Sequence, residues 1–197
     1  MQDFNNKAND SEGETEAGMD AEAKFIDPKE IIGQLELNEG SAVADFGCGS
    51  GYFSIPFARE VGSEGKIYCL DVLSQALESV ESQAKILGIS NVFTKRVNLE
   101  NENGSGLESN SMNWVIMKDV LFQNEKKENV IREAYRVLKP KGRILIMEWS
   151  DKNLLVGPEK SKRISPEKMK ELVSGQKFAI KKEIPAGDFH YVIVAEK

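Results

Sequence analysis

Short apolar runs alternate with longer amphipathic stretches over most of the chain. The short runs are rich in β-branched residues and predict buried strands, whereas apolar positions three and four residues apart predict helices. The predicted strands cover residues 42–46, 66–71, 91–97, 112–117, 143–149, 179–184 and 189–195, and the predicted helices cover residues 27–37, 52–61, 74–87, 125–138 and 166–175.

Cap residues support the helix boundaries. Asp27 precedes Pro28 and Ser165 precedes Pro166 at two predicted helix starts, and Gly88 follows the stretch 74–87. A polar N-cap, a proline at the first helical position and a glycine after the last turn are helix start and stop signals.

The order of these elements predicts an α/β fold. Strands that are separated by helices are joined by right-handed crossovers and become parallel neighbours in one sheet. Only residues 185–188 separate the last two predicted strands. Because this is too short for a crossover, we expect an antiparallel hairpin there. The sequence therefore predicts five parallel strands and a closing hairpin in a single domain over residues 25–197.

The first 24 residues differ in composition from the rest. They contain seven acidic residues, two lysines and almost no large apolar side chains, so they cannot bury enough surface to offset the entropy of ordering. We predict a disordered acidic tail over residues 1–24, and folding of this tail over the active site as a lid is the alternative. The tail carries most of the net charge of −6, so that charge says little about the partners of the folded part.

Composition also bears on the cellular compartment and on whether a metal site is expected. The acidic start of the chain lacks the apolar region of a secretory signal, and the longest apolar runs are much shorter than a membrane span. We therefore expect a cytoplasmic protein with no membrane span. Cys48 and Cys69 offer no disulfide framework. With a single histidine in the chain, a zinc site of the usual kind is not expected, and we predict no metal.

The strongest chemical signal is the segment DFGCGSG, which joins the predicted strand 42–46 to the following helix. Gly47, Gly49 and Gly51 let the backbone turn sharply and approach a ligand closely. The dinucleotide pattern G-x-G-x-x-G is not met, because its third glycine would fall on a tyrosine or a serine. Asp45 would repel a pyrophosphate but suits a ligand that carries an ammonium and a sulfonium group. The turn thus favours S-adenosylmethionine over a nicotinamide dinucleotide, and an ordinary tight turn is the alternative.

Two further polar positions follow predicted strands. Asp71 ends the second strand, twenty residues after Gly51, where a carboxylate can accept two hydrogen bonds from a ribose diol. Asn98 and Leu99 end the third strand, where they could contact an adenine amine and ring. The alternative for Asp71 is a turn or helix-capping role, and the alternative for Asn98 is that of a simple turn asparagine.

In this order DFGCGSG, KIYCLD, MNWVIMKDVLFQ and YRVLKPKGRILIMEW resemble the class I S-adenosylmethionine-dependent methyltransferases. The resemblance is to the type-11 group related to the ubiquinone/menaquinone methyltransferases, and it covers about residues 25–197. It implies a Rossmann-like three-layer sandwich with a seven-stranded sheet in the order 3-2-1-4-5-7-6 and strand 7 antiparallel. Two positions depart from the family pattern, since Asn98 and Asn113 stand where acidic residues are common.

The resemblance also implies which residues hold S-adenosylmethionine. These are Asp45, Gly47, Gly49 and Gly51 at the methionine end, Asp71 with Val72 at the ribose, Asn98 and Leu99 at the adenine, and Lys118 and Asp119 beneath the sulfonium.

Methyl transfer from a sulfonium is an in-line displacement with a good leaving group, so positioning can supply much of the rate and a base is not obligatory. An antiparallel last strand begins at the sheet edge where the fourth and fifth strands end. We expect this to bring together Asp119, Glu148, Trp149, His190 and Tyr191. His190 is the leading candidate for a general base. Glu148 and Tyr191 are the alternatives, and a purely structural histidine also remains open.

The sequence says less about the methyl acceptor than about the cofactor. The segment KDVLF after the fourth strand lacks the Pro-Pro-aromatic motif of amino-methylating nucleic-acid enzymes, and there is no dense basic stripe, so nucleic acid is disfavoured. We predict a small-molecule acceptor and a monomer or homodimer. The alternatives are a module that binds S-adenosylmethionine without its own catalysis, and methylation of a protein partner.

Overall fold

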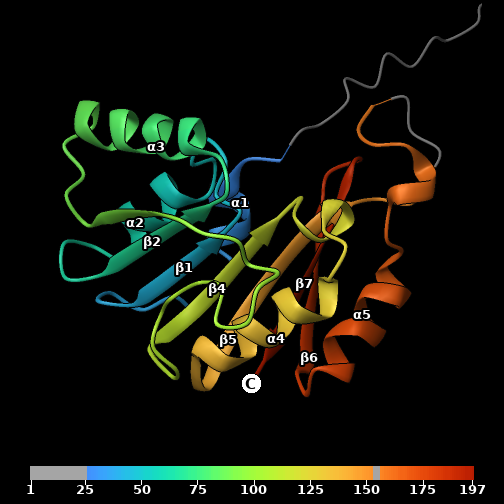
Figure 1. The fold of residues 1–197 in the computed structure, drawn as a ribbon. Coiled ribbons are helices and arrows are strands. Elements are labelled where there is room, and N and C mark those ends of the chain that lie inside the picture. The colour runs from blue at the N-terminus through green and yellow to red at the C-terminus, as the bar shows by residue number, and fades with distance from the viewer. Residues whose placement is uncertain (1–25, 153–155) are drawn as a thin grey trace, which may run out of the picture.

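The computed structural model of the chain describes residues 26–152 and 156–197, and the predicted acidic tail lies outside these residues. Figure 1 shows a central sheet with helices on both sides. The strand order is β3-β2-β1-β4-β5-β7-β6. Strand β7 runs antiparallel to both of its neighbours, and the other neighbouring strands are parallel. The predicted fold, including its closing hairpin, is confirmed.

The elements follow the predicted order. The strands are β1 (Ala42–Phe46), β2 (Lys66–Asp71), β3 (Val92–Arg96), β4 (Met112–Lys118), β5 (Leu138–Trp149), β6 (Ala179–Ala186) and β7 (His190–Glu196). The helices are α1 (Pro28–Ile32), α2 (Ser54–Glu60), α3 (Ser74–Ile86), α4 (Lys127–Val137) and α5 (Pro166–Gly175), with short 3₁₀ turns η1 (Leu121–Gln123) and η2 (Lys160–Lys162).

Two boundaries differ from the prediction by more than two residues. Helix α1 ends at Ile32 rather than at residue 37, because the chain turns at Gly33, whose N–H closes the helix on the carbonyl of Lys29. Strand β5 begins at Leu138, earlier than residue 143, since Leu138 already pairs with Met112 of β4. Pro140 ends the preceding helix as expected but does not delay the strand.

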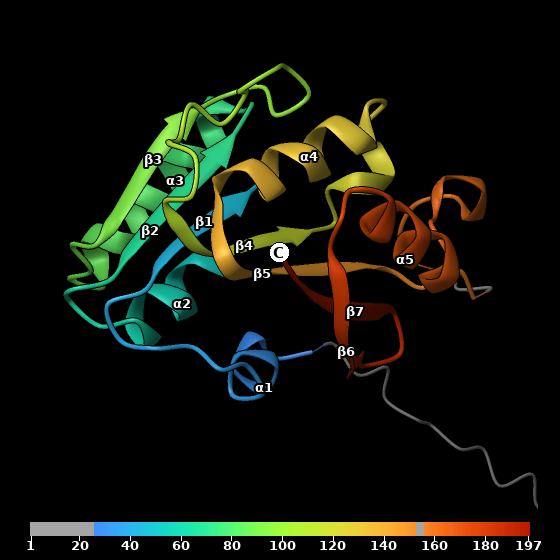
Figure 2. The same cartoon turned by 90° about the horizontal axis from the view of Figure 1, so that it is seen from below.

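The hydrophobic core has two layers, one on each face of the sheet. Figure 2 shows α4 and α5 on one side and α1 and α2 on the other. Val43 and Ile116 pack in the layer with α1, α2 and α3, whereas their neighbours Ala44 and Val115 pack in the layer with α4 and α5. Successive side chains of a strand point to opposite faces of the sheet. The position of a polar residue along its strand therefore decides on which face its side chain lies.

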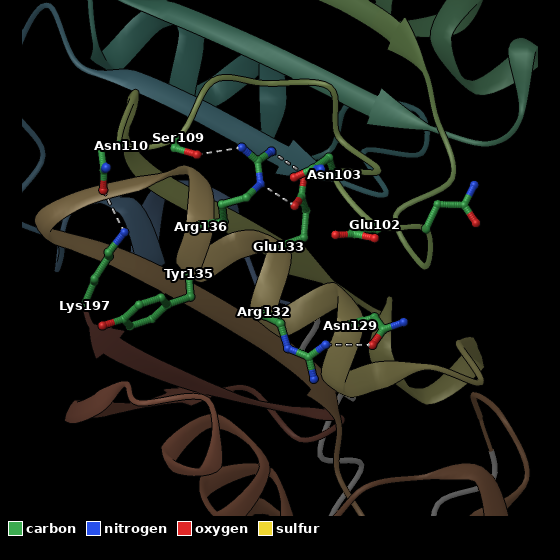
Figure 3. A pocket seen from close by; sticks show the side chains of 11 residues that line it. Glu102, Asn103, Ser109, Asn110, Asn129, Arg132, Glu133, Tyr135, Arg136 and Lys197 are labelled. Carbon is green, nitrogen blue, oxygen red and sulfur yellow. Dashed lines mark hydrogen bonds and ion pairs between the residues drawn. The ribbon is translucent and has the colours of Figure 1, made fainter.

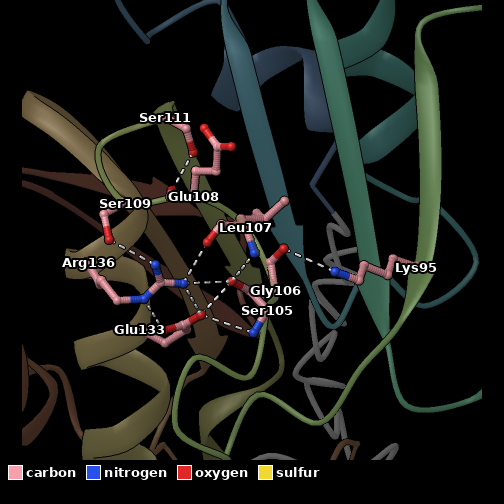
Figure 4. Close-up of polar contacts among 9 residues, drawn as sticks. All are labelled: Lys95, Ser105, Gly106, Leu107, Glu108, Ser109, Ser111, Glu133 and Arg136. Atoms are coloured by element: carbon pink, nitrogen blue, oxygen red, sulfur yellow. Dashed lines mark hydrogen bonds and ion pairs between the residues drawn. The ribbon is translucent and has the colours of Figure 1, made fainter.

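A buried carboxylate fastens the long connection between β3 and β4 to helix α4 (Figure 4). Glu133 accepts hydrogen bonds from the N–H of Ser105 at 3.0 Å and from its hydroxyl at 2.5 Å, and it forms an ion pair with Arg136 at 2.7 Å. Arg136 also donates to the carbonyl of Leu107 at 2.8 Å. Burial raises the pKa of Glu133, but the hydrogen bonds from Arg136 and Ser105 outweigh this and hold it below its usual value.

We expect Glu133→Gln to lower the free energy of unfolding by about 1–3 kcal/mol at neutral pH, because Arg136 and Ser105 lose an ionised acceptor. The native pKa is depressed, so the stabilisation is present above the pKa of the unfolded chain and is lost as the pH falls through the native pKa. Urea unfolding at neutral and acidic pH should show the gap between wild type and variant closing in acid.

The matched control is Glu128→Gln, an exposed position in the same helix, which should change stability by no more than about 0.5 kcal/mol. Equal stability of the wild type and Glu133→Gln at neutral pH would show that the network does not fasten this connection.

Candidate functional site

A cleft of about 640 Å³ opens beyond the carboxyl ends of β1, β2 and β4. We call it the strand-end cleft. Eight of the predicted site residues line it, namely Gly47, Gly49, Asp71, Val72, Asn98, Leu99, Lys118 and Asp119. In an open parallel sheet, the loops that follow neighbouring strands meet at this edge and commonly form a ligand site.

A smaller cavity of about 170 Å³, the glycine pocket, continues from this cleft. Gly47, Gly49 and Lys118 line both cavities, and Asp45 and Tyr52 line the glycine pocket. Gly51 lines neither cavity. A Cβ on Gly51 would lie 3.2 Å from Val80, so Gly51 allows the turn to pack against α3.

The glycine turn shapes the cleft through two residues with positive φ. A Cβ on Gly47 (φ 71°) would lie 2.6 Å from Cγ2 of Val120, so the absence of a side chain lets the turn lie against the segment after β4. A Cβ on Gly49 (φ 52°) would meet nothing within 4 Å. Gly49 therefore keeps the cleft open at a point where a ligand can lie against the backbone.

Asp71 is held in a defined orientation at the end of β2. One carboxylate oxygen accepts from the N–H of Gly49 at 3.0 Å and the other from the N–H of Leu73 at 2.9 Å. Each carboxylate oxygen can accept a second hydrogen bond. Asp71 thus retains acceptor capacity on the cleft side for a pair of hydroxyl groups.

Asp45 lies beneath the glycine pocket and is only 2% exposed. It accepts a hydrogen bond from the hydroxyl of Ser54 at 2.5 Å. Burial raises its pKa to about 6, and the charge of Asp71 contributes to this shift. A buried carboxylate of this kind is stabilised in its ionised form by a neighbouring cation.

Several residues that sequence reasoning did not single out also line the strand-end cleft. They lie in the segments that follow β2, β3 and β4, and they are Leu73, Ala76, Val97, Glu100, Val120, Gln123, Asn124 and Glu125. Glu100 accepts from the N–H groups of Glu125 and Lys126 at 2.6 and 3.0 Å. This contact joins the segment carrying Asn98 to the start of α4. Because its partners lie far apart in the sequence, no local sequence pattern could have predicted it.

A third cavity of about 310 Å³ lies on the face of the sheet covered by α1 and α2. We call it the aromatic pocket, because the rings of Tyr52, Trp149 and His190 line it together with Ile26, Met147 and Lys118. The rings of Trp149 and His190 are 4.3 Å apart between centroids.

Asp119 contacts two of the side chains that line this pocket. Its carboxylate lies 3.0 Å from Nε2 of His190 and forms an ion pair with the ammonium of Lys118. Burial raises the pKa of Asp119, but the hydrogen bond from His190 and the charge of Lys118 outweigh it and hold this pKa below its usual value. Asp119 is therefore ionised at neutral pH, and Nε2 of His190 carries the hydrogen that it donates.

Glu148 and Tyr191, the other predicted bases, lie on the opposite face of the sheet. Glu148 is fully buried and accepts from the N–H of Leu121 at 2.6 Å. Its second oxygen has no hydrogen-bond partner among the described residues, and burial raises its pKa to about 8. The Tyr191 hydroxyl donates to the carbonyl of Ile164 at 2.9 Å. Neither residue lines the aromatic pocket.

Another cavity, of about 750 Å³, follows the outer side of α4 (Figure 3). Arg132 donates to Asn129, Arg136 is paired with Glu133, and the Lys197 ammonium donates to Asn110 at 2.8 Å. Each of these cations therefore already has a partner in the lining of this groove.

The described residues include no group of three or more His, Cys, Asp or Glu side chains that could hold a metal ion. Likewise, no helix within residues 26–152 and 156–197 is long and apolar enough to cross a membrane.

The residues that line the strand-end cleft and the glycine pocket fit S-adenosylmethionine. Asp71 has acceptor capacity for a ribose diol, Gly49 leaves room at the backbone, and Asp45 is a buried carboxylate that a cation would stabilise. Together with the sheet order, these features define a Rossmann-like protein of the class that binds S-adenosylmethionine.

The chain belongs to the methyltransferase domain family, whose model matches residues 37–191. It is 31% identical over 115 residues to the ubiquinone/menaquinone biosynthesis C-methyltransferase UbiE of Haemophilus ducreyi, covering 58% of this chain and 43% of that protein. It is 30% identical over 130 residues to the demethylmenaquinone methyltransferase of Listeria welshimeri, covering 64% of this chain and 52% of that protein. The chain thus spans about half the length of these curated relatives.

Among solved structures, an S-adenosylmethionine-dependent methyltransferase from Aquifex aeolicus has the same fold. Its TM-score is 0.80 at 21% identity, covering 87% of this chain and 90% of that one. The resemblance stated from the sequence motifs is confirmed, and S-adenosylmethionine is the cofactor that this family implies.

We expect Gly47→Ala and Gly49→Ala to have different effects. Both variants place alanine at positive φ, but only the Gly47 variant forces a Cβ against Val120. Gly47→Ala should lower the free energy of unfolding by about 2–4 kcal/mol. Gly49→Ala should cost about 1 kcal/mol but weaken S-adenosylmethionine binding about tenfold, because its methyl group enters the open cleft. Urea unfolding and calorimetric titration measure the two quantities, and the opposite ranking would contradict the assigned roles.

Proposed function

We propose that this protein transfers the methyl group of S-adenosylmethionine to a small-molecule acceptor bound in the aromatic pocket. The observation that carries the proposal is the meeting of the strand-end cleft, the glycine pocket and the aromatic pocket at Lys118. This arrangement puts a cleft suited to the cofactor next to an apolar cavity with a histidine–aspartate pair. The names of the curated relatives support a small-molecule acceptor.

In this proposal Asp71 accepts the ribose hydroxyls, Asn98 and Leu99 contact the adenine, and Asp45 faces the ammonium of the methionine part. When bound, S-adenosylmethionine supplies an electrophilic methyl group on a cationic sulfur. Asp45 in the glycine pocket and Asp71 in the strand-end cleft carry negative charge that favours a cationic ligand.

His190 is the proposed general base. It lines the aromatic pocket, is 8% exposed, and donates from Nε2 to the ionised Asp119. A neutral imidazole that donates from Nε2 has Nδ1 as its basic nitrogen. Asp119 fixes this tautomer and stabilises the imidazolium that forms when His190 accepts a proton. Glu148 and Tyr191 support the structure from the other face of the sheet.

Binding of the cofactor is the direct test. We expect calorimetric titration of the full chain to give micromolar dissociation constants for S-adenosylmethionine and S-adenosylhomocysteine. Asp71→Asn should weaken both at least about tenfold, since a neutral amide replaces the acceptor of the ribose diol. Glu78→Gln, an exposed position on α3, is the matched control. Absence of binding by the wild type would refute the proposal, and binding without turnover on an acceptor panel would favour a non-catalytic module.

Asp45 should make cofactor affinity depend on pH. A cationic ligand binds the ionised carboxylate, so affinity falls as the pH drops through the pKa of about 6 that burial gives Asp45. About tenfold weaker binding is expected at one pH unit below this value. Asp45→Asn should bind more weakly at neutral pH and lose most of this pH dependence. A wild-type affinity that stays constant from neutral pH to about pH 5 would argue against contact between Asp45 and the ligand's cation.

A further inference from the structure

Lys118 has a position that the proposed function does not yet explain. Among the described residues, it alone lines the strand-end cleft, the glycine pocket and the aromatic pocket. Its ammonium is paired with Asp119 and lies 5.3 Å from the centre of the Tyr52 ring. The positive charge therefore stands where the cofactor and the acceptor would meet.

The aromatic pocket has few polar groups to recognise an acceptor. The hydroxyl of Tyr52 already donates to the carbonyl of Ile26. Apart from Lys118 and His190, the remaining lining residues are the apolar Ile26 and Met147 and the indole of Trp149. Three rings in a cavity of about 310 Å³ suit a small, flat molecule. Lys118 and His190 are the cationic and the basic side chain that line this pocket and can act on the acceptor's reactive end.

We propose that the acceptor is a small, flat molecule with a weakly acidic hydroxyl group, of the phenol class, and that Lys118 holds the oxygen anion formed from it. This inference rests on the proposed function and specifies its substrate class.

The charges at the pocket favour such an acceptor over other nucleophiles. An amine would develop positive charge next to the Lys118 ammonium, which costs electrostatic energy at close range. A carboxylic acid is already ionised at neutral pH and has no need of the His190–Asp119 pair. A phenol starts neutral, gives its proton to His190 and leaves an anion that Lys118 can stabilise.

The proposed step balances. The hydroxyl proton passes to Nδ1 of His190, and the acceptor oxygen forms a bond with the methyl carbon while the carbon–sulfur bond breaks. The electron pair of that bond stays on sulfur, so the products are a methyl ether and S-adenosylhomocysteine, and His190 afterwards releases its proton to water. During the transfer, the imidazolium and Lys118 are balanced by Asp119 and the oxygen anion.

The test uses para-nitrophenol, whose ionised form absorbs at a longer wavelength than its neutral form. The probe is titrated into the full chain saturated with S-adenosylhomocysteine. We expect the apparent pKa of the bound probe to fall by about one unit relative to the free probe, which is a tenfold change in its ionisation equilibrium. In Lys118→Met the shift should disappear and affinity for the ionised probe should drop about tenfold, whereas Lys118→Arg should keep most of both.

Other nearby groups are controlled separately. Asp45, Asp71 and Asp119 oppose ionisation of the probe and are unchanged in the Lys118 variants, so the shift reports on Lys118. Para-nitroanisole, which has no hydroxyl group, should bind the wild type and Lys118→Met equally. His190→Asn should leave the bound spectrum of para-nitrophenol ionised. It should slow the methylation of phenol itself, which is neutral at neutral pH and needs a base.

The outcomes separate this inference from the proposed function. A bound probe with the spectrum of the neutral phenol, or equal affinity of the wild type and Lys118→Met for the ionised probe, would overturn the role of Lys118. If S-adenosylmethionine binds and amines or carboxylic acids are methylated while phenols are not, the proposed function stands and the acceptor class is wrong. If the cofactor itself does not bind, the proposed function fails.

Discussion

The site depends on the interaction of one carboxylate with two cationic or basic partners. Asp119 follows β4 in a left-handed conformation (φ 56°), and its N–H donates to the carbonyl of Met147 in β5 at 2.9 Å. Its side chain contacts His190 of β7 and Lys118 of β4. The end of β4 is therefore joined to β5 by a backbone hydrogen bond and to β7 by a hydrogen bond to a carboxylate, which is a strong type of contact. The ion pair with Lys118 adds a cation beside the same carboxylate.

The alternation of side chains along the strands divides the remaining polar groups between two tasks. Trp149 and His190 pair across β5 and β7 and face the aromatic pocket, whereas their neighbours Glu148 and Tyr191 pair in the next register position and face the helices α4 and α5. Glu148 there accepts from the N–H of Leu121, at the start of the turn that follows Asp119. On one face of the sheet, Trp149 and His190 line the aromatic pocket. On the other face, Glu148 holds the segment that follows Asp119.

The strand-end cleft, which is proposed to hold the cofactor, is defined largely by the fold. The aromatic pocket, which is proposed to hold the acceptor, is not. The glycine turn, the carboxylate at the end of β2 and the loop after β3 lie within residues 37–191, which the family model matches. The aromatic pocket is built from segments far apart in the sequence, from Ile26 to His190. Fold alone identifies a class of cofactor, whereas the acceptor has to be argued from the side chains of this pocket.

The sequence by itself predicted the parallel strands, the closing hairpin and half of the residues that line the strand-end cleft, and the resemblance to the family supplied the strand order. These features follow from local signals, since apolar periodicity fixes strands and helices and the residues after parallel strands meet at one edge. Only the tertiary structure decided that Gly51 serves packing, that Glu100 joins two walls of the cleft, and that His190 rather than Glu148 faces the aromatic pocket. The physical reason is that these outcomes depend on strand register and on contacts between residues far apart in the chain, which no local pattern encodes.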